Sequence, residues 1–381
     1  MPLVYVIAGE NSGDVLGASY VRSLKKIYGN NLRFRGVGGE EMREEGVDIL
    51  FDAKQLSYFG IAEVVRHFVT IIRLRARILA DIRSHRPDFL LTIDLPDFNF
   101  SIGKWAKKNG IPVVHVGAPT VWAWRAQRAH KVAQFLDGLA CLFPFEPPYF
   151  TKYGLNAEFL GHPSVAKKQC DPESLVRNYG LMGKMCICLL PGSRASEIER
   201  LGPLLCDVAL RLAADDSRVH FLLPIAAGHH DQVRKNFVRC GDRITFVPPH
   251  KRYEAMTASV CALAASGTVT LELAMCQTPM VVLYKVHALT ALFARWLVYA
   301  PYAALPNIIS GHSIVQEFIQ NQCTATRVYE EARKLMDDAS YRSEMKKNLS
   351  QVRERLSISD ELHARRLRKI CDFFMLKKKA E

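Results

Sequence analysis

The sequence of 381 residues lacks the cysteine pattern of disulfide-rich or zinc-binding proteins. Its ten cysteines include no Cys-x-x-Cys pair, and the two closest, Cys186 and Cys188, lie in an apolar run typical of a strand. No second pair of Cys or His residues stands at zinc spacing, so we predict no metal site. Buried, reduced thiols are expected instead, as is usual in a reducing cytoplasm.

The sequence also lacks the hydrophobic segments that target proteins to membranes. No basic, apolar leader precedes the first strand-like run, so we expect no signal peptide. The longest uncharged region after Arg295 is broken by Pro301 and Pro306 and is too polar at its end to span a bilayer. Any contact with a membrane is therefore expected at its surface.

The composition, with 49% hydrophobic and 23% charged residues, is that of a folded protein with a large core. The net charge of +13 suggests nucleic acid, a membrane surface or a phosphate-rich substrate as partner. The basic excess is spread along the chain without a basic arm, which argues against a dedicated nucleic-acid tail.

Short β-branched runs alternate with helical patterns, and this order predicts right-handed βαβ units with parallel sheets. The rhythm restarts in the second half, so the expected fold class is α/β with two Rossmann-like domains. We expect domains at residues 1–163 and 164–354, followed by a terminal helix at 355–381. The expected strands are 3–8, 89–93, 113–116, 139–143, 186–190, 219–223, 244–247, 260–264 and 280–284.

Ligands of such sheets bind at the carboxyl ends of the strands, so those ends are where chemistry is expected. The first strand ends in Gly9, Glu10 and Ser12, in a turn that is not the Gly-x-Gly-x-x-Gly of dinucleotide-binding proteins. Its backbone N–H groups could face an anion or a sugar at a helix N-terminus. The alternative is a tight turn in which Ser12 or Asp14 caps the helix.

A second strand, 89–93, ends in two carboxylates, Asp94 and Asp97. A carboxylate at the end of a buried strand is poorly solvated, which raises its basicity and suits Asp94 for general-base catalysis. Asp97 stands just before a helical run and is better explained as a helix cap or first-turn residue.

Two turns in the second half predict a nucleoside diphosphate site. Gly192, Ser193 and Arg194 follow a strand and precede a helix, which offers a diphosphate backbone donors and a bidentate guanidinium. The turn of Ser266, Gly267 and Thr268 precedes a helix carrying Glu272, which could accept two ribose hydroxyl groups. Each turn alone could be a simple helix cap.

Together these segments resemble the lipid A disaccharide synthase family, in order and over nearly the whole chain. The motifs that carry the resemblance are Gly-Glu-Asn-Ser-Gly-Asp at 9–14, Ile-Asp-Leu-Pro-Asp-Phe-Asn at 93–99, Val-Trp-Ala-Trp-Arg at 121–125, Phe-Pro-Phe-Glu at 143–146, Gly-His-Pro at 161–163, Leu-Pro-Gly-Ser-Arg at 190–194, Ala-Ser-Gly-Thr at 265–268 and Leu-Pro-Asn at 305–307. The chain departs from the family at Asn11, where Thr is usual, and in its helices after residue 325.

The resemblance implies an inverting, metal-independent glycosyltransferase of the GT-B architecture, with two Rossmann-like domains facing a cleft and a terminal helix that returns to the first. UDP-2,3-diacylglucosamine would be the donor and 2,3-diacylglucosamine 1-phosphate the acceptor, with no cofactor. Asp94 would be the base, Arg194 would meet the leaving-group charge, and Glu10 and Asn307 would be further cleft residues. The sequence has no Asp-x-Asp motif to hold Mg²⁺ on a diphosphate, which agrees with this assignment.

Acylated substrates imply work at a membrane, and two segments of the first domain suit one. Residues 58–79 form a basic amphipathic pattern that includes Phe68, Ile72 and Arg73. Residues 98–136 hold six basic residues, no acidic residue and three of the four tryptophans. The expected acceptor and membrane face comprises Ser12, Asp97, Trp122, Trp124, Arg125, Phe68, Ile72 and Arg73. The alternative is an ordinary helix packed on the sheet.

We expect a cytoplasmic protein, peripheral on the inner face of the inner membrane, and leave a homodimer open. One alternative function is a UDP-N-acetylglucosamine 2-epimerase of the same fold, which would not need the Trp-rich basic face. The other is a basic adaptor for nucleic acid or membrane, against which the even charge distribution argues.

Overall fold

A computed structural model describes residues 1–29, 31–56, 61–124, 126–165, 170–225, 228–287 and 301–371; for residue 11 and residues 61–68 it describes the backbone alone. The chain divides into two compact units. Unit 1 comprises Met1–Pro163 and Ile358–Glu381, and unit 2 comprises Ser164–Ser357. The chain therefore leaves unit 1 after Pro163 and re-enters it at Ile358.

Unit 1 is built on a seven-stranded sheet with the order β3-β2-β1-β4-β5-β6-β7, all strands parallel. The strand order reverses between β1 and β4, where Ala8 lies opposite Ile93 in the register. Its strands are β1 (Leu3–Ala8), β2 (Arg33–Gly38), β3 (Val47–Asp52), β4 (Phe89–Ile93), β5 (Val113–Val116), β6 (Gly138–Cys141) and β7 (Asn156–Phe159). Its helices are α1 (Asn11–Tyr28), α2 (Glu40–Glu44), α3 (Ile61–His85), α4 (Pro96–Lys108), α5 (Arg128–Ala133), α6 (Pro147–Thr151) and α16 (Asp360–Cys371).

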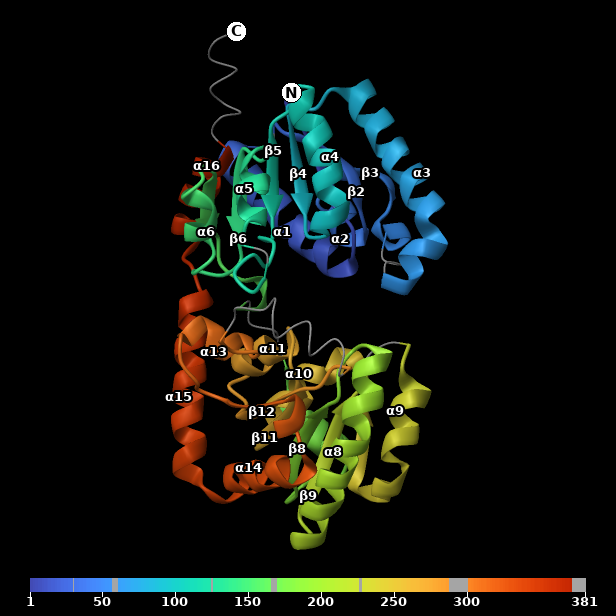
Figure 1. Cartoon of the computed structure of the whole chain (residues 1–381), viewed down its shortest axis with the longest axis vertical. Helices are drawn as coiled ribbons and strands as arrows, with labels where there is room; N and C mark the ends of the chain where they lie inside the picture. The colour runs from blue at the N-terminus through green and yellow to red at the C-terminus, as the bar shows by residue number, and fades with distance from the viewer. Residues whose placement is uncertain are drawn as a thin grey trace. The chain divides into compact units, whose positions relative to one another are not determined.

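The helix α16 completes one face of this sheet although it ends the chain. Its Leu367 and Ile370 are fully buried in the same apolar cluster as Leu16 and Tyr20 of α1. Figure 1 shows α16 beside β6, to which it packs. The core on this face is therefore incomplete without the C-terminal segment.

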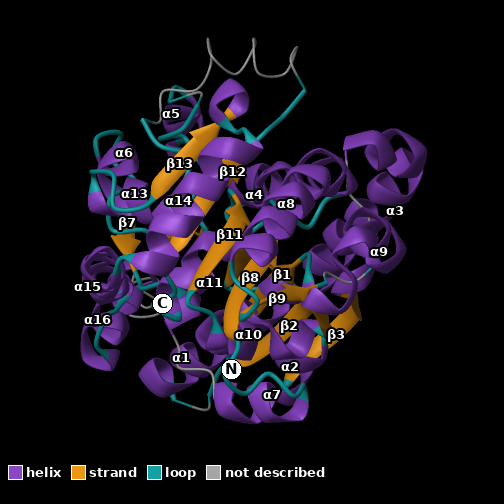
Figure 2. Ribbon diagram, turned by 90° about the horizontal axis from the view of Figure 1, so that it is seen from below, coloured by secondary structure: helices purple, strands orange, loops and turns teal. Residues whose placement is uncertain are grey.

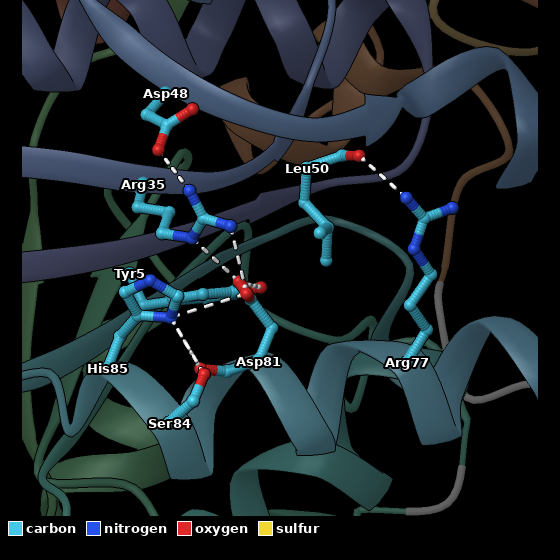
Figure 3. A network of polar contacts seen from close by, with 8 residues as sticks. All are labelled: Tyr5, Arg35, Asp48, Leu50, Arg77, Asp81, Ser84 and His85. Atoms are coloured by element: carbon cyan, nitrogen blue, oxygen red, sulfur yellow. Dashed lines mark hydrogen bonds and ion pairs between the residues drawn. The ribbon is translucent and has the colours of Figure 1, made fainter.

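The C-terminal half of α3 is tied to the sheet by one carboxylate, Asp81 (Figure 3). Asp81 accepts hydrogen bonds from the Tyr5 hydroxyl at 2.9 Å and, at two atoms, from the Arg35 guanidinium at 2.9 Å each. Leu74 and Ile78 of the same helix are buried in the core. This docking leaves the opposite face of α3 turned to solvent.

Unit 2 repeats the design with a six-stranded parallel sheet of order β10-β9-β8-β11-β12-β13. The order reverses between β8 and β11, and Figure 2 shows β8, β11, β12 and β13 as successive strands with helices around them. Its strands are β8 (Met185–Leu190), β9 (Val219–Pro224), β10 (Ile244–Val247), β11 (Cys261–Ala265), β12 (Met280–Tyr284) and β13 (Gln316–Ile319). Its helices are α7 (Pro172–Asn178), α8 (Ala195–Asp215), α9 (His230–Phe237), α10 (Arg252–Ala258), α11 (Val269–Met275), α13 (Leu305–Ser310), α14 (Ala325–Asp337) and α15 (Ala339–Leu356).

The structure confirms the α/β class and the two parallel sheets, but it contains strands that the sequence did not predict: β2, β3, β7 and β13. The strands β3, β7 and β13 lie at or next to sheet edges, where short and partly polar strands are stable. β2 lies inside the sheet, but its Gly36 and Gly38 and two arginines obscured the pattern. No helix among the described residues has the length and apolarity needed to cross a bilayer.

Candidate active site

In unit 1 the segments after β1 and β4 lie side by side, because those strands are neighbours at the point where the strand order reverses. Asp94 follows β4 directly, and its backbone N–H still bonds to the Val116 carbonyl at 2.9 Å. This places the predicted base, Asp94, next to the Gly9–Glu10 turn, at the sheet edge where ligands of such folds bind.

The backbone at Asp94 is strained and is held by its neighbours. Asp94 and Leu95 have φ angles of 48° and 42°, a left-handed region that costs energy for residues other than glycine. Asn99 of α4 is buried and donates from Nδ2 to the Asp94 carbonyl at 2.7 Å. A Cβ on Gly9 would lie 1.8 Å from Leu95 Cδ1, and one on Gly117 would lie 2.5 Å from Asp94 Oδ1. Asn99 and the close packing at Gly9 thus hold the backbone of this turn, and Gly117 leaves the room that the Asp94 carboxylate occupies.

The surroundings of Asp94 make its carboxylate more basic than usual. Burial raises its pKa to about 6, and the negative charge of Glu10 adds to the increase. The structure therefore brings together two predicted residues, Asp94 and Glu10, one of them partly buried and the other exposed. A carboxylate with this pKa is largely ionised at neutral pH and can still accept a proton efficiently.

The residues around this turn differ from the expected caps. Glu10 is the N-cap residue of α1, without a side-chain cap, and Ser12 is exposed two residues further on, in the first turn. Asp14 is buried and bonds to the start of α2, accepting from the Gly39 amide at 2.6 Å. Asp97 lies in the first turn of α4, as expected, and forms an ion pair with Arg128.

The predicted tryptophan face is only partly exposed. Trp124 is 37% exposed, whereas Trp122 is half-buried with its ring 5.4 Å from that of Phe145. Beside Trp122 lies Glu146, which accepts the Phe143 amide at 3.0 Å. Burial raises the pKa of Glu146 to about 8, although its hydrogen bonds oppose the shift. Arg125 lies outside the described residues.

The basic segment of residues 98–136 is less charged in space than in sequence. Lys107 pairs with Asp137 at 2.5 Å and Arg128 pairs with Asp97, two acids that stand just outside the segment. Trp105 packs on the core under Arg83, 5.1 Å from its ring, so it does not belong to an exposed face.

On α3 the described side chains separate into two faces. Ile72 and Arg73 are exposed, as is Val69, with exposed fractions of 49% for Ile72 and 58% for Val69. These side chains lie opposite the stripe of Leu74 and Ile78 that packs on the sheet. The Phe68 side chain lies outside the described part of the structure.

In unit 2 the turn after β8 already contains an anion. Gly192 has a φ of 117°, and a Cβ there would lie 2.5 Å from Glu197 Oε2. The same oxygen accepts the backbone N–H of Ser193 at 3.0 Å and that of Arg194 at 3.3 Å. Glu197 Oε1 accepts from Arg194 Nη1 at 3.1 Å. The donors predicted to bind a diphosphate thus hold the Glu197 carboxylate in this structure.

The turn after β11 lies beside the first, since β8 and β11 are neighbours. Ser266 donates from Oγ to the Ala303 carbonyl at 2.7 Å, and Gly267 and Thr268 are exposed ahead of α11. Glu272, one turn into α11, accepts hydrogen bonds from two residues of α10, Arg252 and Tyr253. The two expected halves of a nucleotide site therefore meet at one edge of the unit 2 sheet.

Asn307 has a different role from the expected one. Its side chain is fully buried, and Nδ2 donates to the Val315 carbonyl at 2.9 Å and to Glu317 Oε1 at 2.7 Å. Its Oδ1 accepts the amides of Ile314 and Val315 at 2.7 and 3.0 Å. With every hydrogen bond of the amide used inside unit 2, the side chain holds a loop together and does not reach a ligand.

Comparison with known proteins decides the family. The family model described as Lipid-A-disaccharide synthetase matches residues 4–370. The chain belongs to this family. The lipid-A-disaccharide synthase of Nitrosococcus oceani is 36% identical to it over 93% of this chain and 92% of its own length. The lipid-A-disaccharide synthase of Neisseria meningitidis serogroup C is 37% identical over 84% of this chain and 85% of its own length.

Solved structures share the fold at much lower identity. The complex of S. aureus MnaA with UDP has a TM-score of 0.63 at 16% identity, covering 91% of each chain. The UDP-GlcNAc 2-epimerase from Neisseria meningitidis bound to UDP-GlcNAc has a TM-score of 0.63 at 14% identity, covering 91% of this chain and 94% of its own. These likenesses show the GT-B-like fold and no more.

As a lipid-A-disaccharide synthetase, the chain is a glycosyltransferase of lipid A biosynthesis, and its site contains residues that sequence reasoning missed. Asn99 is part of one sequence motif, but the motif does not show that its side chain bonds to the Asp94 carbonyl. That contact depends on the strained turn at Asp94, which only the tertiary structure shows. Glu197 stands three residues after Arg194, a capping-box spacing that could have been noticed. Arg252 and Tyr253 carried no sequence signal. Within the described residues, no group of three His, Cys, Asp or Glu side chains is placed to hold a metal.

Proposed function

We propose that this lipid-A-disaccharide synthetase transfers 2,3-diacylglucosamine from UDP to 2,3-diacylglucosamine 1-phosphate. The products are a β-1,6-linked tetraacyl disaccharide 1-phosphate and UDP. The observation that carries the proposal is Asp94, a carboxylate with a pKa raised to about 6 by burial, fixed at the carboxyl edge of the unit 1 sheet. Membership of the family supplies the substrates.

The chemistry asks little more of unit 1 than a correctly placed base. Asp94 takes the proton from the 6-hydroxyl of the acceptor as its oxygen attacks the anomeric carbon of the donor. The bond from that carbon to UDP breaks in the same displacement, so the configuration inverts without a covalent intermediate. Glu10, whose charge raises the pKa of Asp94, keeps the carboxylate basic enough for this step.

Unit 2 has the groups that a UDP leaving group needs. Once the diphosphate displaces the Glu197 carboxylate, Arg194 and the Ser193 amide meet the diphosphate charge at the start of α8. The dipole of this 21-residue helix adds to the effect. Gly267 and Thr268, exposed ahead of α11, offer a second set of donors, and Glu272 accepts from the ribose, whereas both donors of Ser266 are already bonded inside unit 2. A protein with the same fold, S. aureus MnaA, has been solved with UDP, which supports a nucleotide as the ligand.

Product formation from defined substrates tests the reaction. The purified protein is incubated with the two acylated glucosamine substrates, and the lipid products are identified by mass spectrometry. We expect disaccharide 1-phosphate to appear only when both substrates are present. Epimerisation of soluble UDP-N-acetylglucosamine without an acylated acceptor would instead favour the 2-epimerase alternative.

We propose further that unit 1 binds an anionic membrane surface through α3, on the cytoplasmic side of the inner membrane. The exposed apolar side chains of Val69 and Ile72 stand beside the exposed Arg73 on a helix whose other face is docked on the sheet. Apolar insertion and attraction of cations to anionic lipid act together in such helices.

Co-sedimentation with vesicles of phosphatidylglycerol and phosphatidylethanolamine measures this binding. We expect Ile72→Glu to weaken binding severalfold and added salt to weaken it further. Val238→Glu is the matched control, because Val238 is a 74% exposed apolar side chain in unit 2. Equal binding by Ile72→Glu and Val238→Glu, or binding indifferent to salt, would contradict the proposal.

A further inference from the structure

We infer that Arg252 and Tyr253 of α10 are positioning residues that hold Glu272 so that it reads one ribose hydroxyl of the nucleotide. This inference rests on the proposed function, which places UDP at the edge of the unit 2 sheet. It concerns residues that neither the sequence motifs nor the family comparison single out.

The contacts form a closed triangle around the carboxylate. Arg252 Nε donates to Glu272 Oε2 at 3.0 Å, and Arg252 Nη2 donates to Oε1 at 3.1 Å. The Tyr253 hydroxyl donates to the same Oε1 at 2.9 Å and accepts from Arg252 Nη2 at 3.0 Å. The guanidinium also lies over the Tyr253 ring, 4.4 Å from its centroid. A bidentate pair of this kind fixes the orientation of a carboxylate as well as its position.

The triangle of hydrogen bonds is partly buried, so it can restrict the Glu272 side chain. The side chains of Arg252 and Glu272 are 35% and 21% exposed, so solvent only partly screens the pair. The Glu272 carboxylate would otherwise rotate freely on three side-chain bonds. Holding it in advance spares the nucleotide the entropy of ordering it, which is how preorganisation strengthens binding.

The number of free acceptor positions on the Glu272 carboxylate determines how many ribose hydroxyls it can bind. A carboxylate offers about four lone-pair positions, two on each oxygen. Arg252 and Tyr253 occupy both positions on Oε1, and Arg252 occupies one on Oε2. Counting the contacts of the described residues, one position remains, on Oε2, so Glu272 can accept a single hydroxyl in this geometry. The sequence alone suggested two.

The test compares the binding of UDP, 2′-deoxy-UDP and 3′-deoxy-UDP to the full-length protein by calorimetry. We expect the wild type to reject one of the two deoxy nucleotides by about tenfold or more, and the other much less. We call the ratio of the dissociation constants of the two deoxy nucleotides the discrimination ratio. Arg252→Met and Tyr253→Phe should weaken UDP binding and bring this ratio close to one. Their kcat at saturating donor should stay within about twofold, since neither residue contacts the reacting atoms. Arg252→Lys should fall between them and the wild type.

Two matched controls separate positioning from stability. Tyr341→Phe removes another Tyr–Glu hydrogen bond of unit 2, from the Tyr341 hydroxyl to Glu331 at 2.7 Å. Arg218→Met removes another Arg–carboxylate pair, with Asp216 at 2.8 Å. Both should lower thermal stability without changing the ratio. If Arg252→Met fails to fold, Arg252→Lys and Tyr253→Phe carry the test.

The outcomes distinguish this inference from the function beneath it. If Glu272→Ala abolishes the discrimination between the two deoxy nucleotides but the Arg252 and Tyr253 variants retain it, the positioning role is overturned. The ribose site at Glu272 would then still stand. Tighter UDP binding by Arg252→Met would also overturn it, because Arg252 would then compete with the nucleotide. An unchanged ratio in Glu272→Ala would instead reject the ribose site that the proposed function assumes.

Discussion

The charged groups at the carboxyl edges of the two sheets differ in whether they are paired. At the edge of unit 1, the charge of a second acid, Glu10, raises the pKa of Asp94, and no ion pair to Asp94 occurs among the described residues. At the edge of unit 2, Arg194 is paired with Glu197 and Glu272 is paired with Arg252. One edge leaves a charge uncompensated, and the other neutralises its charges internally.

This difference separates reactivity from recognition. A base must keep an unsatisfied tendency to take a proton, and burial beside another acid maintains it. A binding site instead gains from groups held in place by partners, because fewer of them must be ordered when the ligand arrives. The strained turn at Asp94 serves reactivity, and the closed triangle of hydrogen bonds at Glu272 serves recognition.

Removing the charge at Asp94 should have the largest effect. In Asp94→Asn we expect kcat to fall by about 10³-fold, because the amide of Asn cannot take the proton from the acceptor hydroxyl. The affinity for UDP should stay the same, since unit 2 supplies the nucleotide contacts. Steady-state kinetics and calorimetry on the same preparation check both parts, and unchanged turnover would exclude Asp94 as the base.

Removing the cation of unit 2 should come next. Arg194→Ala should cost about 2 to 4 kcal/mol in transition-state stabilisation, seen as a loss in kcat. Arg200→Ala is the control, because Arg200 lies on the same helix and bonds only to the Ser196 carbonyl among the described contacts. A change confined to KM would contradict a role for Arg194 on the leaving group.

A pair of glycine substitutions tests the division directly. Gly117→Ala places a methyl group 2.5 Å from Asp94 Oδ1, and Gly192→Ala places one 2.5 Å from Glu197 Oε2. We expect Gly117→Ala to lower kcat on the order of 10²-fold by displacing the base. Gly192→Ala should raise the KM for the donor with less effect on kcat. Thermal unfolding of both variants measures how much each substitution destabilises the fold. If both variants showed the same kinetic defect, the proposed difference between the two sheet edges would be wrong.

The pH dependence of the reaction tests the raised pKa of Asp94 in unit 1. Burial raises the pKa of Asp94 to about 6, and the base must be ionised to act. Activity as kcat/KM should therefore fall about tenfold per pH unit below 6 and level off above it. Glu10→Gln removes the neighbouring negative charge, so the inflection should move to lower pH. An inflection near 4 in the wild type would show that Asp94 is not perturbed.

The smallest effect should come from the anion already present in the unit 2 turn. Glu197→Gln removes a negative charge from the place predicted for the diphosphate, so UDP should bind severalfold more tightly. The same change weakens the capping box of α8 and should cost about 1 kcal/mol of stability. Glu199→Gln, an exposed neighbour on α8, is the control. Weaker UDP binding would show that Glu197 supports the turn rather than competing for it.

Much of this site could be predicted because its residues follow strands. Asp94, Arg194 and Glu272 each stand at or just beyond a strand-to-helix turn, and parallel sheets place such turns at one edge. The misses have physical causes. Asn307 was expected in the cleft because of the Leu-Pro-Asn motif, but its amide is fully hydrogen-bonded to the Ile314–Glu317 segment inside unit 2. Lys107 appeared free in sequence, yet it meets Asp137 across the fold.

The sequence by itself determined the parallel α/β class, the two repeats of strand and helix, and the chemistry at the strand ends. These follow from local periodicity and from motifs of a few residues. Tertiary structure alone decided which groups hold the reactive ones: Gly117 and Asn99 around Asp94, and Arg252 with Tyr253 around Glu272. Those partners come from other elements, up to 23 residues away in the case of Gly117 and Asp94, and no local pattern records a contact that only packing creates.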